Sequence, residues 1–156
     1  MKAEHINPFV RSTVAVFSTM CGCELTRGEL SLKEQFQPEY EISGVIGLSG
    51  KLAGTVVVSL HESMALYIAE TLLGTRPDQI DDDVVDAVGE MTNMIAGKAK
   101  GELEEFDMSL SLPTVISGSG HKVQFGSQVK PICIPYSSEH GDLTVEVGLV
   151  EALVPA

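Results

Sequence analysis

The sequence predicts an α+β fold in which helices pack on a mostly antiparallel β-sheet. Three segments carry apolar residues at helical spacings, and the other apolar segments are short and bounded by Gly, Ser and Pro, which is typical of strands joined by turns. The chain has 156 residues, of which 44% are hydrophobic. This length and composition suit one core, so we expect a single domain over residues 1–156.

The first helix is expected over residues 8–20. Pro8 suits a first helical turn, Asn7 suits the N-cap before it, and Gly22 suits a helix stop. The residues at helical spacings are Phe9, Val10, Thr13, Val14, Val16, Phe17 and Met20. This pattern predicts an amphipathic helix.

A β-hairpin is expected after a polar stretch. Residues 24–40 are polar and irregular, with one strand expected near Leu30–Phe36. Two apolar runs then follow, Ile42–Leu48 and Leu52–Leu60. The Ser49-Gly50-Lys51 turn between them predicts a hairpin.

Two further helices follow the hairpin. The first begins after His61 and stops at Gly74, and residues 75–82 form a polar connector. The acidic residues 81–83 supply an N-cap for the next helix and favour its dipole. Its apolar pattern runs to about Glu105.

The rest of the chain is expected to form strands. The segments Leu52–Val58 and Leu143–Val147 each follow a Gly-bearing turn, which indicates pseudo-repeated hairpins. The strands are expected at Ser109–Ser117, Lys122–Val129, Ile132–Ser137 and Leu143–Val150.

Charge and cysteine content restrict the location and the partners of the protein. The 22 acidic and 10 basic residues give a net charge of −12, so nucleic acid and anionic membranes are poor partners. No apolar run approaches the ~20 residues that a membrane-spanning helix needs. Cys21, Cys23 and Cys133 form an odd set with no favourable disulfide spacing. We therefore expect a cytoplasmic protein.

The third helix carries the candidate site residues. On a helical wheel, one arc holds Val84, Val88, Met91, Ile95 and Ala99, with Ala87 and Met94 beside it. We take this arc as the core face. The opposite side holds Asp86, Glu90, Asn93 and Gly97, so a carboxylate and a carboxamide are expected one turn apart on the exposed face.

A Glu-x-x-Asn spacing is weak evidence alone, and Glu4 and Asn7 also have it. Two costs in helix stability distinguish the copy at Glu90 and Asn93. Asn93 at mid-helix costs several tenths of a kcal/mol relative to Ala, and Gly97 costs about 1 kcal/mol while it leaves bare surface for another molecule. Gly89 adds a further cost. A helix with such residues on its exposed face is a candidate functional surface.

Residues 90–100, Glu-Met-Thr-Asn-Met-Ile-Ala-Gly-Lys-Ala-Lys, resemble the signature helix of the CheC/CheX/FliY family of chemotaxis phosphatases. That motif is Glu-x-x-Asn followed by an apolar pair and a Gly. Residues 6–9 and the hairpin at 47–54 are similar to the CheX branch in particular, and the order of elements matches across essentially the whole chain. Relatives with two sites carry a second motif in the middle of the earlier long helix, so its absence there implies one site.

The resemblance implies hydrolysis of the aspartyl phosphate of a phosphorylated CheY-like response regulator in chemotaxis signalling. Asn93 would orient the attacking water, and Glu90 would pair with the active-site Lys of the regulator. Asp86, Gly97 and Lys98 are expected to border the contact. The chain itself is expected to bind no cofactor, with Mg²⁺ held in the active site of the regulator, and a homodimer is also expected.

One alternative stays open, namely a docking module that binds a receiver domain or a flagellar-switch component without turnover. The intact Glu90 and Asn93 favour the enzyme. The four His and three Cys show no metal-ligand spacing, so no metal site is predicted. Cys21 and Cys23 are interpreted as small buried residues.

Overall fold

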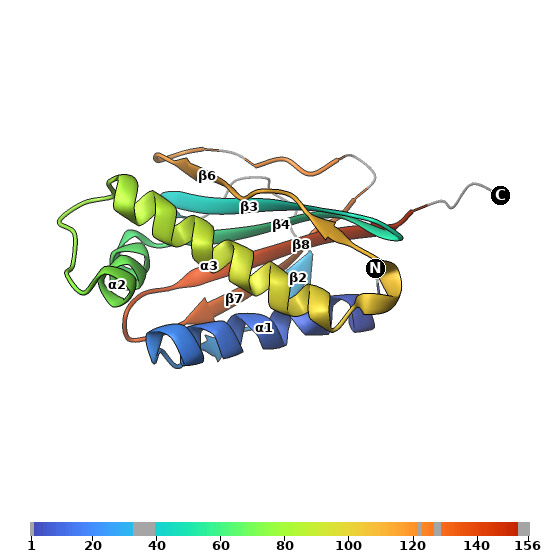
Figure 1. Cartoon of the computed structure of the whole chain (residues 1–156), viewed down its shortest axis with the longest axis horizontal. Coiled ribbons are helices and arrows are strands. Elements are labelled where there is room, and N and C mark those ends of the chain that lie inside the picture. The colour runs from blue at the N-terminus through green and yellow to red at the C-terminus, as the bar shows by residue number, and fades with distance from the viewer. Residues whose placement is uncertain (1, 33–39, 122, 127–128, 153–156) are drawn as a thin grey trace.

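In the part of the chain that the structure describes, three helices cover one face of an antiparallel sheet (Figure 1). The computed structural model describes residues 2–32, 40–121, 123–126 and 129–152. The helices are α1 (Ala3–Cys21), α2 (Glu62–Leu73) and α3 (Asp82–Gly101), and a 3₁₀ turn, η1, spans Glu104–Phe106. The strands are β1 (Thr26–Arg27), β2 (Ser31–Leu32), β3 (Ile42–Ser49), β4 (Leu52–Leu60), β5 (Ser109–Leu110), β6 (Thr114–Ser117), β7 (Ile132–Ser137) and β8 (Leu143–Glu151).

Two hairpins form the centre of the sheet. The strand order is β1-β7-β8-β4-β3-β5, and in addition β2 pairs with β7 and β6 pairs with β3. Strands β4 and β8 pair antiparallel from Leu52↔Glu151 to Leu60↔Leu143, which joins the β3–β4 hairpin to the β7–β8 hairpin. The predicted α+β class and both hairpins are therefore confirmed.

The core lies between this sheet and the helices. Side chains alternate along a strand, so every second residue of β4 and β8 faces the helices, as Val56 and Val145 do. The predicted core face of α3 is confirmed, since Val84, Val88, Met91, Ile95 and Ala99 are all buried. Ala87 is buried beside them and Met94 is half-buried.

Helix α1 begins earlier than the sequence predicted. It starts at Ala3 rather than at residue 8, and its N-cap is Lys2, so the assignment of Asn7 as the N-cap was wrong. Pro8 lies inside the helix and has no N–H for the carbonyl of Glu4. The added turn buries Ile6 to 2% exposure, and this burial favours the longer helix despite the missing hydrogen bond. The predicted stop at Gly22, with φ +57°, is confirmed.

The ends of α2 agree with the prediction, whereas α3 ends early. The His61 Nδ1 atom accepts the Ser63 N–H at 3.1 Å and caps α2, which stops at Gly74. Helix α3 ends at Gly101 rather than near Glu105. The chain then turns through η1, because this turn buries Leu103 in the core.

Three predicted strands differ in the structure. Pro113, which has no N–H for a strand ladder, precedes β6, so the predicted strand 109–117 is divided into β5 and β6. Of the predicted strand Leu30–Phe36, only Ser31–Leu32 is observed, and residues 33–36 lie outside the described residues.

The third difference is the strand predicted at 122–129, which is absent from the described residues 123–126 and 129. Instead, Phe125 lies over Gly148 of β8, where an added Cβ would be 2.6 Å from its ring. This segment therefore packs on the sheet through a side chain rather than through a ladder of hydrogen bonds.

Helix α3 approaches β3 very closely at Gly44. A Cβ at Gly44 would lie 1.9 Å from Thr92 Oγ1 and 2.9 Å from Thr92 Cβ, so only glycine fits. The Thr92 hydroxyl donates to the Val88 carbonyl at 2.8 Å, which holds its side chain in place. Because Thr92 directly precedes Asn93, this contact fixes the rotation of α3 that leaves Asn93 on the outer side.

We predict that Gly44→Ala destabilises the protein by about 1–3 kcal/mol, because the new methyl group overlaps Thr92. Urea unfolding of the single variants, and of the double variant with Thr92→Gly, measures the coupling between the two sites. The double variant should lose less stability than the sum of the two single variants. Strict additivity would contradict the close contact.

Burial raises the pKa of two groups at α1, the thiol of its last residue, Cys21, and the hydroxyl of Tyr136, which packs against it. Burial, followed by the charge of Cys23, raises the pKa of the Cys21 thiol to about 11. Burial raises the pKa of Tyr136 to about 12, and its hydroxyl donates to the Val10 carbonyl at 3.2 Å. Both groups are therefore neutral in the folded protein at neutral pH.

We predict that the stability of the protein falls as the pH rises from 9 to 11. The unfolded thiol loses its proton near pH 9 and the folded thiol only near 11, so alkaline solution favours the unfolded state in this window. Urea unfolding at a series of pH values should show a smaller loss for Cys21→Ala than for the natural chain. Equal losses would rule out Cys21 as a cause.

Candidate functional site

The exposed side of α3 carries the residues that the sequence singled out. Glu90, Asp86 and Lys98 are exposed, whereas Asn93 and Gly97 are half-buried. In the described part of the chain, the Glu90 carboxylate and the Asn93 carboxamide have no hydrogen-bond or ion-pair partner. Both side chains are therefore available to another molecule.

Charges at the two ends of α3 stabilise the helix that holds this pair. Asp81 accepts the Val84 N–H at 3.0 Å, and Asp82 and Asp83 lie in the first turn, close to the positive end of the helix dipole. Lys98 and Lys100 lie in the last turn, close to its negative end. These contacts offset the poor helix formers at mid-helix.

The two mid-helix glycines have different surroundings. Gly89 is buried against β6, where a Cβ would lie 3.5 Å from Val115 Cγ2, so our placement of it on the exposed face was wrong. At Gly97 a Cβ would lie 3.9 Å from Leu110 Cδ1, which is an ordinary contact. Packing against the described residues thus does not explain a glycine at position 97.

A groove between α1 and α3 adjoins the pair. Its volume is about 420 Å³. The groove is lined by Ala15, Val16, Thr19, Met20, Asn93, Met94, Gly97 and Lys98. The α1 residues of this groove were not predicted from the sequence, because a helical wheel shows which face of a helix is exposed but not which other helix lies beside it.

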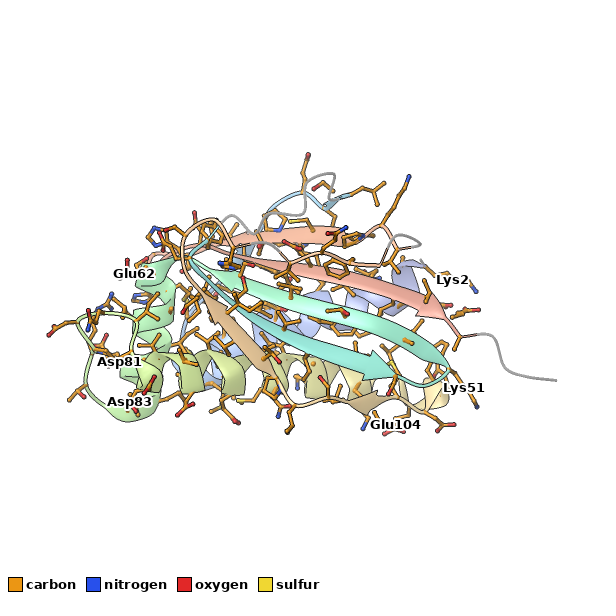
Figure 2. The ribbon with its side chains drawn as sticks, turned by 90° about the horizontal axis from the view of Figure 1, so that it is seen from above. Lys2, Lys51, Glu62, Asp81, Asp83 and Glu104 are labelled. Carbon is orange, nitrogen blue, oxygen red and sulfur yellow. The ribbon has the colours of Figure 1, made fainter. Side chains whose placement is uncertain are left out.

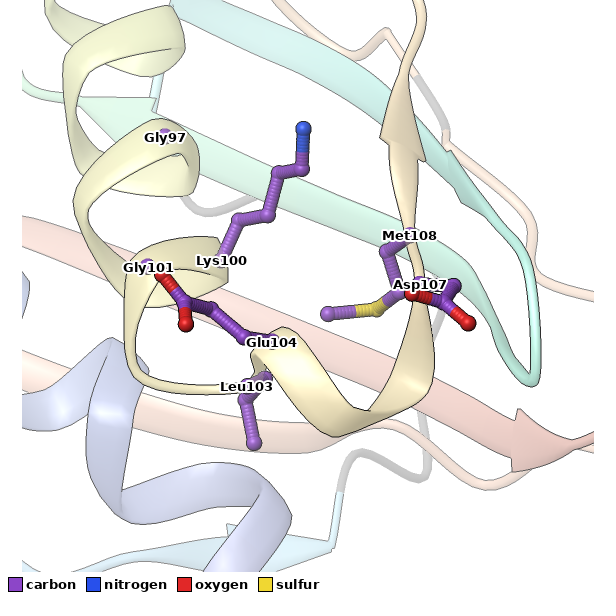
Figure 3. Close-up of a pocket in the computed structure, with 7 residues that line it drawn as sticks. All are labelled: Gly97, Lys100, Gly101, Leu103, Glu104, Asp107 and Met108. Atoms are coloured by element: carbon purple, nitrogen blue, oxygen red, sulfur yellow. The ribbon is translucent and has the colours of Figure 1, made fainter.

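A second hollow lies at the C-terminal end of α3 and has a volume of about 580 Å³ (Figure 3). Two of the α3 residues that line this hollow, Gly97 and Gly101, contribute no side chain. Lys100 extends from the helix, and Met108 points across from the opposite wall, as Figure 3 shows. Gly97 therefore lines both hollows, and the bare surface of α3 continues from one to the other.

The chemistry of this surface suits positioning rather than covalent catalysis. A carboxamide offers a donor and an acceptor without charge, and a carboxylate attracts a cation. Among the described residues no three His, Cys, Asp or Glu lie close enough together to hold a metal ion. Cys21 and Cys23 are buried, as predicted. The exposed side of α3 therefore offers an uncharged amide and a carboxylate for contact with another molecule.

Comparisons with known proteins identify the family. The family described as chemotaxis phosphatase CheX matches residues 42–137. A relative, the CheY-P phosphatase CheX of Thermotoga maritima, is 30% identical over 94% of this chain and 97% of its own length. The crystal structure of the chemotaxis protein CheX from Vibrio vulnificus is 35% identical, covers 95% of this chain and 100% of its own, and superimposes with a TM-score of 0.87.

The fold also matches a more distant structure, a CheX–CheY–BeF₃–Mg²⁺ complex from Borrelia burgdorferi. It is 24% identical, covers 94% of this chain and 98% of its own, and has a TM-score of 0.81. This chain belongs to the CheX family of chemotaxis phosphatases. In the described residues, no helix combines the length and the apolar content needed to cross a membrane.

We predict that Gly97→Ala stabilises the protein by up to about 1 kcal/mol. Alanine is the better helix former, and its methyl group meets only an ordinary contact with Leu110. The free energy of unfolding in urea measures this gain. A loss of stability would show that Gly97 is needed for packing, and the bare surface would then need no other explanation.

Proposed function

We propose that this chain is a phosphatase that hydrolyses the aspartyl phosphate of a phosphorylated CheY-like response regulator in chemotaxis signalling. The observation that carries the proposal is the pair of Glu90 and Asn93 on the exposed side of α3, neither of which has a partner among the residues that the structure describes. Membership of the CheX family supports it, as does the 30% identity to a CheY-P phosphatase. The pair lies one helical turn apart, so both side chains can reach one partner site.

Asn93 positions the attacking water in this proposal. Its carboxamide can accept a hydrogen bond from the water and donate another to a phosphoryl oxygen, and it remains uncharged beside an anion. Phosphoryl transfer is accelerated mainly by positioning and by electrostatic stabilisation. Holding the attacking water in place therefore makes a large contribution to the rate. The half-buried position of Asn93 on a stable helix restricts the amide to few orientations.

Glu90 pairs with the active-site Lys of the regulator. Its exposed carboxylate has no cation partner in the described part of this chain, so it can form that ion pair at no cost to an existing one. The pair anchors α3 and orients the Lys towards the phosphoryl group. Glu90 therefore acts in docking more than as a general base.

Mg²⁺ belongs to the regulator in this mechanism. The Borrelia burgdorferi structure contains CheX, CheY, BeF₃ and Mg²⁺ together. In our proposal the regulator brings the metal and its Lys, which neutralise charge on the phosphoryl group. This chain then adds the water-positioning amide.

Three further residues border the contact. Asp86 lies one turn before Glu90, and Lys98 lies one turn after Met94, both exposed. Gly97 lets the surface of the regulator approach the backbone of α3, since no side chain extends there.

A cytoplasmic location, a single domain over 1–156 and a homodimer stay predictions.

We predict that Asn93→Ala lowers the rate of dephosphorylation by roughly 10²-fold or more while it leaves binding of the regulator nearly unchanged, because the amide acts on the water. The lifetime of the phosphorylated regulator, with Mg²⁺ and a substoichiometric amount of this protein, measures the rate. The matched control is Asn7→Ala, which removes an exposed Asn of the other Glu-x-x-Asn copy on α1. It should behave as the natural chain does.

Unchanged turnover in Asn93→Ala, or loss of binding in that variant, would contradict the assignment. Binding without turnover by the natural chain would instead support a docking module.

A further inference from the structure

Leu112 is a large apolar side chain that faces solvent. It is 89% exposed, whereas the next most exposed large apolar residue in the described part of the chain, Leu32, is 57% exposed. A side chain this exposed adds nothing to the core, and the contact of its apolar surface with water is unfavourable. Such a residue is a candidate for contact with another molecule.

The backbone around Leu112 is held firmly. The Ser111 N–H donates to the Gly47 carbonyl at 2.9 Å, and the Gly47 N–H donates to Ser111 Oγ at 2.8 Å. The Ser111 hydroxyl donates to the Leu112 carbonyl at 3.0 Å, and Pro113 restricts the next residue. The backbone at Leu112 is therefore ordered before any partner binds, which lowers the entropy cost of a contact through this side chain.

Leu112 lies beside the middle of α3. Residues 110–113 run along α3 in the opposite direction. A Cβ at Gly89 would be 3.8 Å from Pro113, whereas a Cβ at Gly97, further along the helix, would be 3.9 Å from Leu110. The eight residue steps from Gly89 to Gly97 along the helix span about 12 Å. The three residue steps from Leu110 to Pro113 in the extended segment span about 10 Å. The level of Leu112 is therefore near Asn93, and Figure 2 shows this segment running along α3 into β6.

The other side of the pair is also apolar. The groove between α1 and α3 carries Met20, which is 38% exposed, and the half-buried Met94. Asn93 and Gly97 line the same groove, so it is continuous with the proposed phosphatase site. Methionine side chains adapt to varied apolar partners.

We propose that the receiver domain docks on two apolar contacts that flank Glu90 and Asn93, with Leu112 on one side and Met20 with Met94 on the other. This inference rests on the proposed function and deepens it. The polar pair then acts on the phosphoryl group, and the flanking contacts supply affinity and exclude water around it. The partner surface is expected to carry apolar side chains on both sides of its phosphorylation site.

The test measures affinity and turnover separately. Leu112→Gln and Met20→Gln replace an apolar side chain by a polar one of comparable size. Leu32→Gln is the matched control at the opposite edge of the sheet, on β2. The probe is a CheY-type regulator held in its activated form by beryllofluoride and Mg²⁺, titrated calorimetrically. Urea unfolding checks that each variant is folded.

We expect each of the two variants to raise the Kd at least about fivefold and to raise KM more than it lowers kcat, while the control leaves both unchanged. An unchanged Kd for Leu112→Gln and Met20→Gln would overturn the proposal, as would the absence of binding by the natural chain. If the Kd values follow the expected pattern but neither the natural chain nor the variants show turnover, the proposed phosphatase function is contradicted. The proposed docking surface is then still supported.

Discussion

The close contact between Gly44 of β3 and Thr92 of α3 is the constraint on which the rest of the site depends. Two degrees of freedom describe how a helix packs on a sheet here, namely its distance from the sheet and its rotation about its own axis. The missing side chain at Gly44 sets the distance, and Thr92, held by its bond to the Val88 carbonyl, sets the rotation. Asn93 is the next residue, so the same contact that closes the core determines where the carboxamide points.

This arrangement explains why the exposed side of α3 can hold poor helix formers. The helix is stabilised by its buried face and by the charges at its ends, not by the propensity of its outer residues. The outer face is thus free to carry an unpartnered amide and a bare glycine at Gly97. Stability and function are separated on the two faces of one helix, and close approach of a partner requires no change in the core.

The sequence predicted the helices and the central hairpins because their signals are local. Periodicity, the Asp81 cap and the stops at Gly22 and Gly74 depend on neighbouring residues only, and all were confirmed. Two of the failures have a common cause. Pro8 inside α1 and Phe125 packed on Gly148 depend on burial against distant segments, which periodicity does not reveal. For the same reason the wheel predicted Glu90 and Asn93 on one face but gave no sign of Met20 or Leu112 beside them.

The central claim is that the exposed side of α3 places Asn93 and Glu90 at the phosphorylation site of a receiver domain. A crystal structure of this protein bound to a CheY-type regulator, activated by beryllofluoride and Mg²⁺, tests it most directly. We expect the Asn93 carboxamide to lie within hydrogen-bond reach of a water in line with the beryllium, and the Glu90 carboxylate to pair with the Lys of the regulator. A complex in which the regulator contacts another face, with α3 left in solvent, would contradict it.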